Sequence, residues 1–259
     1  MIRQELFRKD NEMRNNGTKV EDARPDPKPR MRPHLWQAYL FWNELVEMRK
    51  RHNLRISSIE RGKSNLDAAL EQDFMDIMNL DKLIKLSKNT MVNFGEESAP
   101  EVWNWITSIR GLGEGGLAAQ LIAQIDDIGK FSNVSKLWRF AGLAVIDGKA
   151  ERNQPGEKAH KNGRLRAVCY LISEQFIKQQ TPLYADIYYQ EKSRLRELHP
   201  EPEGKQYTDG HLHNMAMRKA VKIFLQHLWV IWREAEGLPI TMPYAIDILQ
   251  HADYVEPID

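Results

Sequence analysis

Four glycines stand within six positions between two apolar segments, at Gly111, Gly113, Gly115 and Gly116. Glycine lets the backbone turn at positive φ and lets other groups approach closely, because it has no Cβ. N–H groups exposed in such a turn, at the positively polarised start of a helix, can bind a phosphate without selecting a base. The pattern is therefore typical of a helix-hairpin-helix phosphate site. A tight interhelical turn without a ligand explains the glycines equally well, and Glu114 would compete with a phosphate there.

A second candidate site is the stretch from Lys130 to Tyr170, where nine basic residues face only three acidic ones. The whole chain has 37 Lys and Arg against 36 Asp and Glu, so this excess is local. Such a concentration of positive charge suits phosphates, and a solvated surface is the alternative explanation. The residues that we expect to bind nucleic acid here are Lys149, Arg152, Lys158, Lys161, Arg164 and Arg166.

Helices must position both sites, because the apolar residues recur at helical spacing along most of the chain. No long window shows the alternation of a strand, so the expected fold class is mainly α, with an irregular basic loop at about 145–163. A polar break is expected at residues 95–100. The predicted helices cover about 34–53, 64–94, the segments on either side of the glycine turn, 134–142, 164–180, 184–198 and 211–236.

The same patterns predict four segments. These are a disordered tail (1–32), a helical hairpin or coiled coil (33–95), a helix-hairpin-helix domain (100–240) and a C-terminal extension (241–259). Each apolar face of the hairpin is too wide to leave in water. It must meet the other helix, the second half of the chain or another copy, so we expect a homo-oligomer formed through the N-terminal helices.

Composition favours a protein of the cytoplasm that does not enter a membrane. Cys169 is the single cysteine, which excludes a disulfide within one chain, and the first residues show no apolar run of a signal peptide. No stretch approaches the roughly 18 consecutive apolar residues that a spanning helix needs.

The order of these parts resembles the C-terminal transposase domain of the Piv-type, bridge-RNA-guided insertion-sequence recombinases. In both, a glycine hairpin leads into an alanine-rich helix, here GLGEGGLAAQLIAQIDDIGKF, and a Phe-Ala-Gly-Leu-Ala motif follows at 140–144. The later elements are matched by Lys161, Gly163, Leu165 and Arg166, and by an Arg-Lys pair at Arg218 and Lys219. The resemblance covers about 100–236, and the upstream helices are similar to the family's coiled coil. It implies a protein of DNA transposition and recombination.

Two departures from that family bear on catalysis. Its members carry a RuvC-like domain with four acidic metal ligands, whereas only the expected tail precedes Pro33 here. The family also uses a serine, able to form a covalent link to DNA, in the loop between the two motifs. Residues 145–160 of this sequence contain no Ser, Thr, Tyr or Cys. The resemblance therefore implies binding without catalytic residues.

Other chemically suggestive residues have simpler explanations. His211 and His213 lack a third spaced ligand, so a solvated helix start with Asp209 as its cap is favoured over zinc. Asp126 and Asp127 point about 100° apart on a helix, which disfavours a shared metal. Cys169 lies on an apolar stripe and is expected to be an inert core thiol. We therefore expect no metal and no cofactor.

Three hypotheses follow from the sequence. The leading one is a catalytically inactive, transposase-like protein that binds DNA, with RNA as the alternative polymer. The second is a subunit of an active recombinase that works with a separate nuclease chain. The third is a protein-interaction scaffold whose active part is the helical hairpin.

Overall fold

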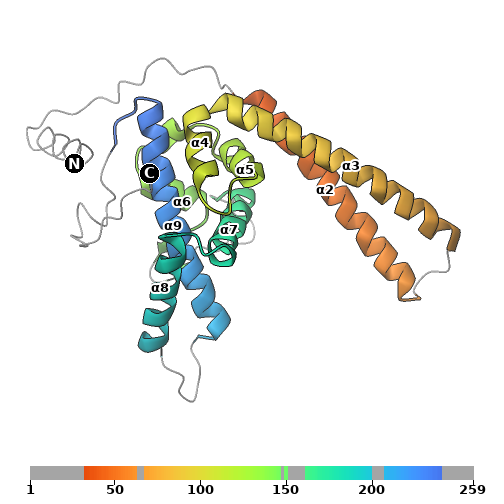
Figure 1. Ribbon diagram of the computed structural model, residues 1–259. Coiled ribbons are helices and arrows are strands. Elements are labelled where there is room, and N and C mark those ends of the chain that lie inside the picture. Colours follow the sequence, from red (N-terminus) through yellow and green to blue (C-terminus); the bar gives the residue numbers. More distant parts are fainter. Residues whose placement is uncertain (1–31, 63–66, 147–148, 151–160, 200–206, 241–259) are drawn as a thin grey trace, which may run out of the picture.

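The computed structural model describes residues 32–62, 67–146, 149–150, 161–199 and 207–240. Eight α-helices contain most of these residues, which confirms the mainly α fold class (Figure 1). Two of the helices form a long arm on one side of the molecule, and the middle helices form its body (Figure 1). A second, shorter arm is formed by α8 (Tyr184–Leu198) and the first half of α9 (Asp209–Ala235), whose second half runs through the body (Figure 1).

The long arm consists of α2 (Pro33–Glu60) and α3 (Asp67–Ser98), which lie side by side (Figure 1). Pro33 begins α2 at a position where its missing N–H is no loss. Leu45 and Leu80 are buried along the arm, and Arg49 Nη1 contacts Asp81 Oδ1 at 2.7 Å. The expected apolar stripe of the second helix falls largely on residues before 76, whose side chains lie outside the described part.

The polar break expected at 95–100 is wrong, because α3 continues to Ser98 and α4 (Pro100–Ser108) begins two residues later. Gly95 is helical and buried. A Cβ on Gly95 would lie 2.8 Å from Cζ3 of Trp103 and 3.1 Å from Cβ of Ala119. This glycine therefore allows α3 to pack closely against the helices that follow, instead of ending the helix.

One core joins the base of the long arm to the body. It contains Leu35, Tyr39 and Met91 from the arm together with Phe224 and Trp229 of α9. The other contributing helices are α4, α5 (Gly116–Ile125), α6 (Val134–Phe140), α7 (Gly163–Lys178) and, through Tyr184 at its first residue, α8. The arm and the segment at 100–240 are thus not separated at the level of the core.

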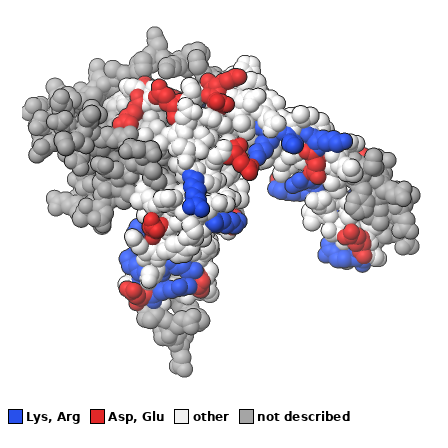
Figure 2. All heavy atoms as spheres, viewed as in Figure 1, with Lys and Arg blue, Asp and Glu red and all other residues white. Residues whose placement is uncertain are grey.

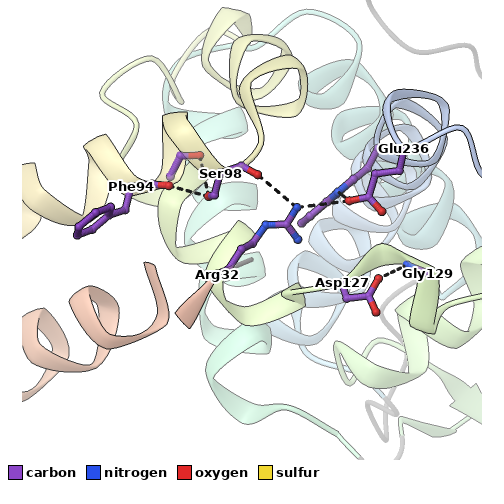
Figure 3. A network of polar contacts seen from close by, with 8 residues as sticks. Arg32, Phe94, Ser98, Asp127, Gly129 and Glu236 are labelled. Atoms are coloured by element: carbon purple, nitrogen blue, oxygen red, sulfur yellow. Dashed lines mark hydrogen bonds and ion pairs between the residues drawn. The ribbon is translucent and has the colours of Figure 1, made fainter. Parts of the chain in front are cut away.

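Arg32 links the base of the long arm to the body, although the sequence predicts that it belongs to the disordered tail (Figure 3). Its side chain is buried, and its Nη2 lies 3.5 Å from Ser98 O and 3.4 Å from Glu236 Oε1. The guanidinium also lies over the ring of Trp232, whose Nε1 donates to the same Glu236 oxygen at 2.8 Å. The start of α2, the end of α3 and the end of α9 are therefore linked. The rest of the expected tail and the extension at 241–259 lie outside the described residues.

The short arm pairs α8 (Tyr184–Leu198) with the first half of α9 around a small second core. Thr208 caps α9 by accepting a hydrogen bond from His211 N at 3.3 Å. The loop that we expected to be irregular contains a short antiparallel pair, β1 (Val145–Ile146) with β2 (Lys149–Ala150). A 3-10 turn, η1 (Ile128–Lys130), follows α5.

None of the described helices is both long enough and apolar enough to cross a membrane.

Candidate nucleic-acid interface

The predicted glycine turn lies between α4 and α5. Gly111 and Gly115 have φ values of 94° and 71°, which a residue with a Cβ rarely adopts. The turn is closed by hydrogen bonds from Leu112 N to Ile109 O at 2.9 Å and from Gly115 N to Leu112 O at 3.1 Å. The glycine segment is therefore a tight turn that joins α4 to α5.

Packing inside the chain accounts for most of these glycines. A Cβ on Gly115 would lie 2.6 Å from Cη2 of Trp103, and one on Gly116 would lie 2.8 Å from Cε of Lys88. A Cβ on Gly111 would meet Cγ of Gln179 at 3.0 Å. Only Gly113 has room around it, because its nearest neighbour would be a carbonyl oxygen at 3.4 Å.

The start of α5 already has charged neighbours. The stem of Lys88, from α3, runs past Gly116, and its Nζ lies 3.1 Å from Oε2 of Glu114. A phosphate approaching the first N–H groups of α5 would have to displace this ion pair. Glu114, the competitor expected from the sequence, is thus paired with a lysine at the same helix end.

Only part of the basic stretch can be placed. Arg152 and Lys158 lie outside the described residues, and Lys149 is placed in β2 by its backbone alone. Lys161 is half-buried just before α7, whereas Arg164 and Arg166 are exposed in its first turn.

Asn162 fixes the start of α7. Its Oδ1 accepts hydrogen bonds from Arg164 N and Leu165 N, both at 3.0 Å. Its Nδ2 donates to Oε1 of Gln124 at 2.8 Å, which attaches the start of α7 to the end of α5. Asn162 and Gln124 are positioning residues that we did not identify from the sequence; the Asn-Gly pair before the helix was the available signal.

The basic side chains at this helix start point in two directions. Lys161 and Arg166 pass Gly142 after α6, because a Cβ there would lie 3.1 Å from Cδ of Lys161 and 3.3 Å from Cδ of Arg166. Arg164 lies near α2 instead. Burial raises the pKa of Tyr39, and the positive charge of Arg164 partly opposes that rise. The structure thus brings Lys161 and Arg166 together and places Arg164 on another side of α7.

The glycine turn and the basic helix start are not neighbours. The turn lies at the start of α5 beside the end of α7, where Thr181 Oγ1 donates to Arg110 O at 2.8 Å. Asn162, at the other end of α7, contacts Gln124 near the end of α5. Eight residues of helix separate Gly116 from Gln124, or about 12 Å at 1.5 Å per residue. The two predicted halves of the interface therefore stand about one short helix apart.

The basic surface continues onto α9, which we did not assign to the site from the sequence. Arg166 contributes to lowering the pKa of Arg218, after the larger effect of burial. Arg218 in turn contributes to lowering the pKa of Lys222, again after burial. The signal available in the sequence was the spacing of four between Arg218 and Lys222, which places them on one helix face.

Other basic residues have structural partners. In Figure 2, Lys and Arg gather over the short arm of α8 and α9, while Asp and Glu gather near the junction of α3 and α4. On the short arm, Glu191 contacts Arg194 at 2.6 Å and Lys219 at 2.7 Å. Asp209 contacts Arg196 at 2.7 Å and Lys192 at 3.2 Å. Each of these cations therefore has a carboxylate partner within the chain, with two cations to each carboxylate.

The carboxylates and histidines that suggested metal chemistry are engaged elsewhere. Asp126 pairs with Lys130 at 2.6 Å, and Asp127 accepts from Gly129 N at 2.7 Å (Figure 3). Nδ1 of His213 lies 2.6 Å from the hydroxyl of Tyr188. Within the described residues, no three His, Cys, Asp or Glu side chains are grouped so that they could hold a metal.

The predictions for Asp209 and Cys169 have clear outcomes in the structure. The expectation that Asp209 caps the last helix is wrong, because Thr208 is the cap and Asp209 forms ion pairs instead. The prediction for Cys169 is confirmed, since the residue is buried in the core and burial raises the pKa of its thiol to about 12.

The resemblance to the recombinase family gains no support from comparison with known proteins. No protein-family model matches the chain, and a search of curated proteins finds no significant match.

Proposed function

We propose that the chain is a transposase-like protein that binds nucleic acid, DNA before RNA, without cutting it. One observation carries the proposal: Arg164 and Arg166 are exposed in the first turn of α7, where no acidic residue is present. Cations are unfavourable at a helix start, by about 0.3–1 kcal/mol each, because the helix dipole is positive there. In the described part of the chain, neither arginine forms an ion pair with a carboxylate.

A phosphate would remove this conflict. Near the start of α7 a phosphate would be attracted by the helix dipole and by Arg166, and Arg164, on another side of the helix, would contact a different part of the nucleic-acid backbone. Such contacts position a protein on a nucleic-acid backbone and carry no sequence information. The basic start of α7 would therefore bind the nucleic-acid backbone, and selectivity for a nucleotide sequence would have to come from other residues or from a partner.

The proposal of binding without cleavage rests on the sequence between the two matched motifs. Residues 145–160 offer no hydroxyl or thiol that could attack phosphorus. Cys169 does not replace it, because its thiol is buried and its pKa is raised to about 12.

The test is a binding titration with labelled duplex DNA, single-stranded DNA and structured RNA across a salt series. The wild type is compared with Lys161→Ala, Arg164→Ala, Arg166→Ala combined, and with Lys178→Ala at the opposite end of α7 as control. We expect steep salt dependence, and an affinity of the triple variant lower by roughly 100-fold with a smaller salt slope. Equal binding by the wild type and the triple variant, or no salt dependence, would contradict the proposal.

We also propose that copies of the chain associate through the long arm. Phe41 and Met48 of α2, seven residues apart, are 54% and 39% exposed, and Leu86 of α3 is 63% exposed. Sedimentation of the wild type against a Phe41→Ser, Met48→Ser variant tests this. We expect a concentration-dependent oligomer that the variant loses, and a wild-type monomer at all concentrations would exclude it.

A further inference from the structure

Two half-buried cations lie on one face of α9, next to α6. Arg218 and Lys222 are four residues apart on the helix. Nζ of Lys222 lies 4.1 Å from the centre of the Trp138 ring, and Trp138 Nε1 donates to the carbonyl of Lys222 at 2.9 Å. The ammonium is therefore held in one place by an aromatic ring that is itself fixed to the α9 backbone.

These cations and Arg166 form a series of like charges. Burial and Arg166 both lower the pKa of Arg218, and burial and Arg218 both lower the pKa of Lys222. Across the described residues, no Asp or Glu forms an ion pair with any of the three. Lys219, between the two on the same helix, shows the contrast, since it contacts Glu191 at 2.7 Å.

Like charges brought together in a partly dry position cost free energy unless an anion compensates them. Arg166 also lies beside Lys161 at Gly142, so the series is continuous with the basic start of α7. We propose that Arg166, Arg218 and Lys222 together hold one phosphate of a bound nucleic-acid backbone. The inference rests on the proposed nucleic-acid binding and assigns to it a phosphate site on α9.

The chemistry of the three side chains suits a phosphate. Two guanidinium groups offer planar pairs of N–H donors, which match two phosphate oxygens, and an ammonium adds a point charge. Trp138 attracts Lys222 by a cation–π contact, which orders the ammonium before the ligand arrives. A preordered cation loses less entropy on binding.

A purely structural role of Lys222 and a phosphate-binding role predict opposite effects on the unfolding temperature when the charge is removed. If Lys222 served only to pack on Trp138, its removal would lower the unfolding temperature. If the cations repel one another in the free protein, removal of their charge should leave that temperature equal or higher. Methionine is the suitable replacement, because it keeps an unbranched apolar stem and has no charge.

The experiment compares Arg218→Met, Lys222→Met with the wild type, using Lys219→Met on the same helix as matched control. For the double variant we expect affinity for duplex DNA at least about tenfold lower, a salt slope smaller by about one, and no drop in unfolding temperature. For Lys219→Met we expect near-normal affinity and a lower unfolding temperature, because Glu191 loses a partner.

The outcomes separate this inference from the proposed function. A double variant with normal affinity and slope overturns the phosphate site, while loss of binding by the Lys161, Arg164, Arg166 variant would still support the proposed function. A wild type that binds no nucleic acid at low salt overturns both. Millimolar inorganic phosphate, compared with chloride at equal ionic strength, should leave the unfolding temperature of both proteins alike. A rise in the wild type alone, together with an unchanged DNA affinity of the double variant, would assign free phosphate and overturn the backbone assignment.

Discussion

The glycine turn and the basic stretch that leads into α7 were both expected to bind phosphates, but their surroundings in the structure differ. The turn is accounted for by neighbours within the chain, with Trp103 against Gly115, Lys88 against Gly116 and an ion pair between Lys88 and Glu114. The basic surface is not, because Arg166 and Arg218 lack acidic partners in the described part.

This difference indicates which of the two surfaces is shaped for a ligand. A glycine whose presence is explained by packing gives no evidence of a ligand. A charged side chain held where it costs free energy does give such evidence, because a bound counter-charge would offset the cost. The same contrast exists among basic residues, since the cations of the short arm share Glu191 and Asp209, whereas Arg164 and Arg166 form no ion pair with a carboxylate of the described residues. The basic surface is therefore the better candidate interface, although the glycine motif was the more familiar signal.

The largest effect on stability should come from Gly115→Ala. The new Cβ would lie 2.6 Å from Trp103 at a φ of 71°, so we expect a loss of about 3 kcal/mol in the free energy of unfolding. Gly113→Ala is the matched control and should cost less than about 1 kcal/mol. Denaturant unfolding of both variants checks this. If they were equally stable, packing would not be what fixes the turn.

A somewhat smaller loss is expected for Arg32→Met, which tests the junction between the long arm and the body. The variant removes the contacts to Ser98 O and Glu236 Oε1 and leaves Glu236 with Trp232 alone. We expect a loss of about 2 kcal/mol, with nucleic-acid affinity unchanged for the folded protein. Denaturant unfolding and DNA binding, measured on the same preparation, test this structural role of Arg32. A loss of DNA affinity without a loss of stability would place Arg32 in the nucleic-acid interface instead.

The paired cations of the short arm predict a pH dependence. Burial alone would raise the pKa of Glu191, but hydrogen bonds from Arg194 and Lys219 and their charges outweigh it, so the pKa is lowered. A lowered pKa in the folded state adds stability above the unfolded pKa of about 4.3 and loses it as the pH falls through the folded value. Glu191→Gln should therefore cost about 1 kcal/mol at neutral pH and progressively less below about pH 4. Unfolding curves at a series of pH values give the answer, and a constant difference at all pH values would contradict the ion pairs.

The smallest perturbation is a chemical probe of Cys169, in the part of the molecule explained by packing. With a pKa of about 12, the thiol is almost entirely protonated at pH 8. We expect iodoacetamide to label it only after unfolding, as measured by mass spectrometry. Rapid labelling of the native protein would show that the α7 core is open to solvent.

The helices were largely predictable from the sequence, and the contacts between them were not. Apolar spacing located α7 and α9 well, because each has one face in the core. The polar neighbours of Gly95 in the sequence predict a break between two helices. Only the position of Trp103 in the fold shows that Gly95 allows close packing within a helix. Thr208 and Asp209 are both good caps, so their roles depended on where Arg196 lies.

The candidate site was predictable only in part for the same reason. The charge excess around Lys161 is visible in the sequence, and so is the spacing of Arg218 and Lys222. That these groups approach one another follows from the packing of α6, α7 and α9, which no local pattern encodes. Likewise, the distance between the glycine turn and the basic helix start depends on the opposite directions of α5 and α7.

The most direct test of the contrast is one salt-series titration of duplex DNA against two variants, Gly113→Ala in the turn and Arg164→Ala, Arg166→Ala on α7. Both changes are expected to leave the fold intact. We expect Gly113→Ala to bind like the wild type, and the arginine variant to bind at least roughly tenfold more weakly with a smaller salt slope. Loss of binding by Gly113→Ala, with the arginine variant unaffected, would contradict it and place the phosphate site in the glycine turn.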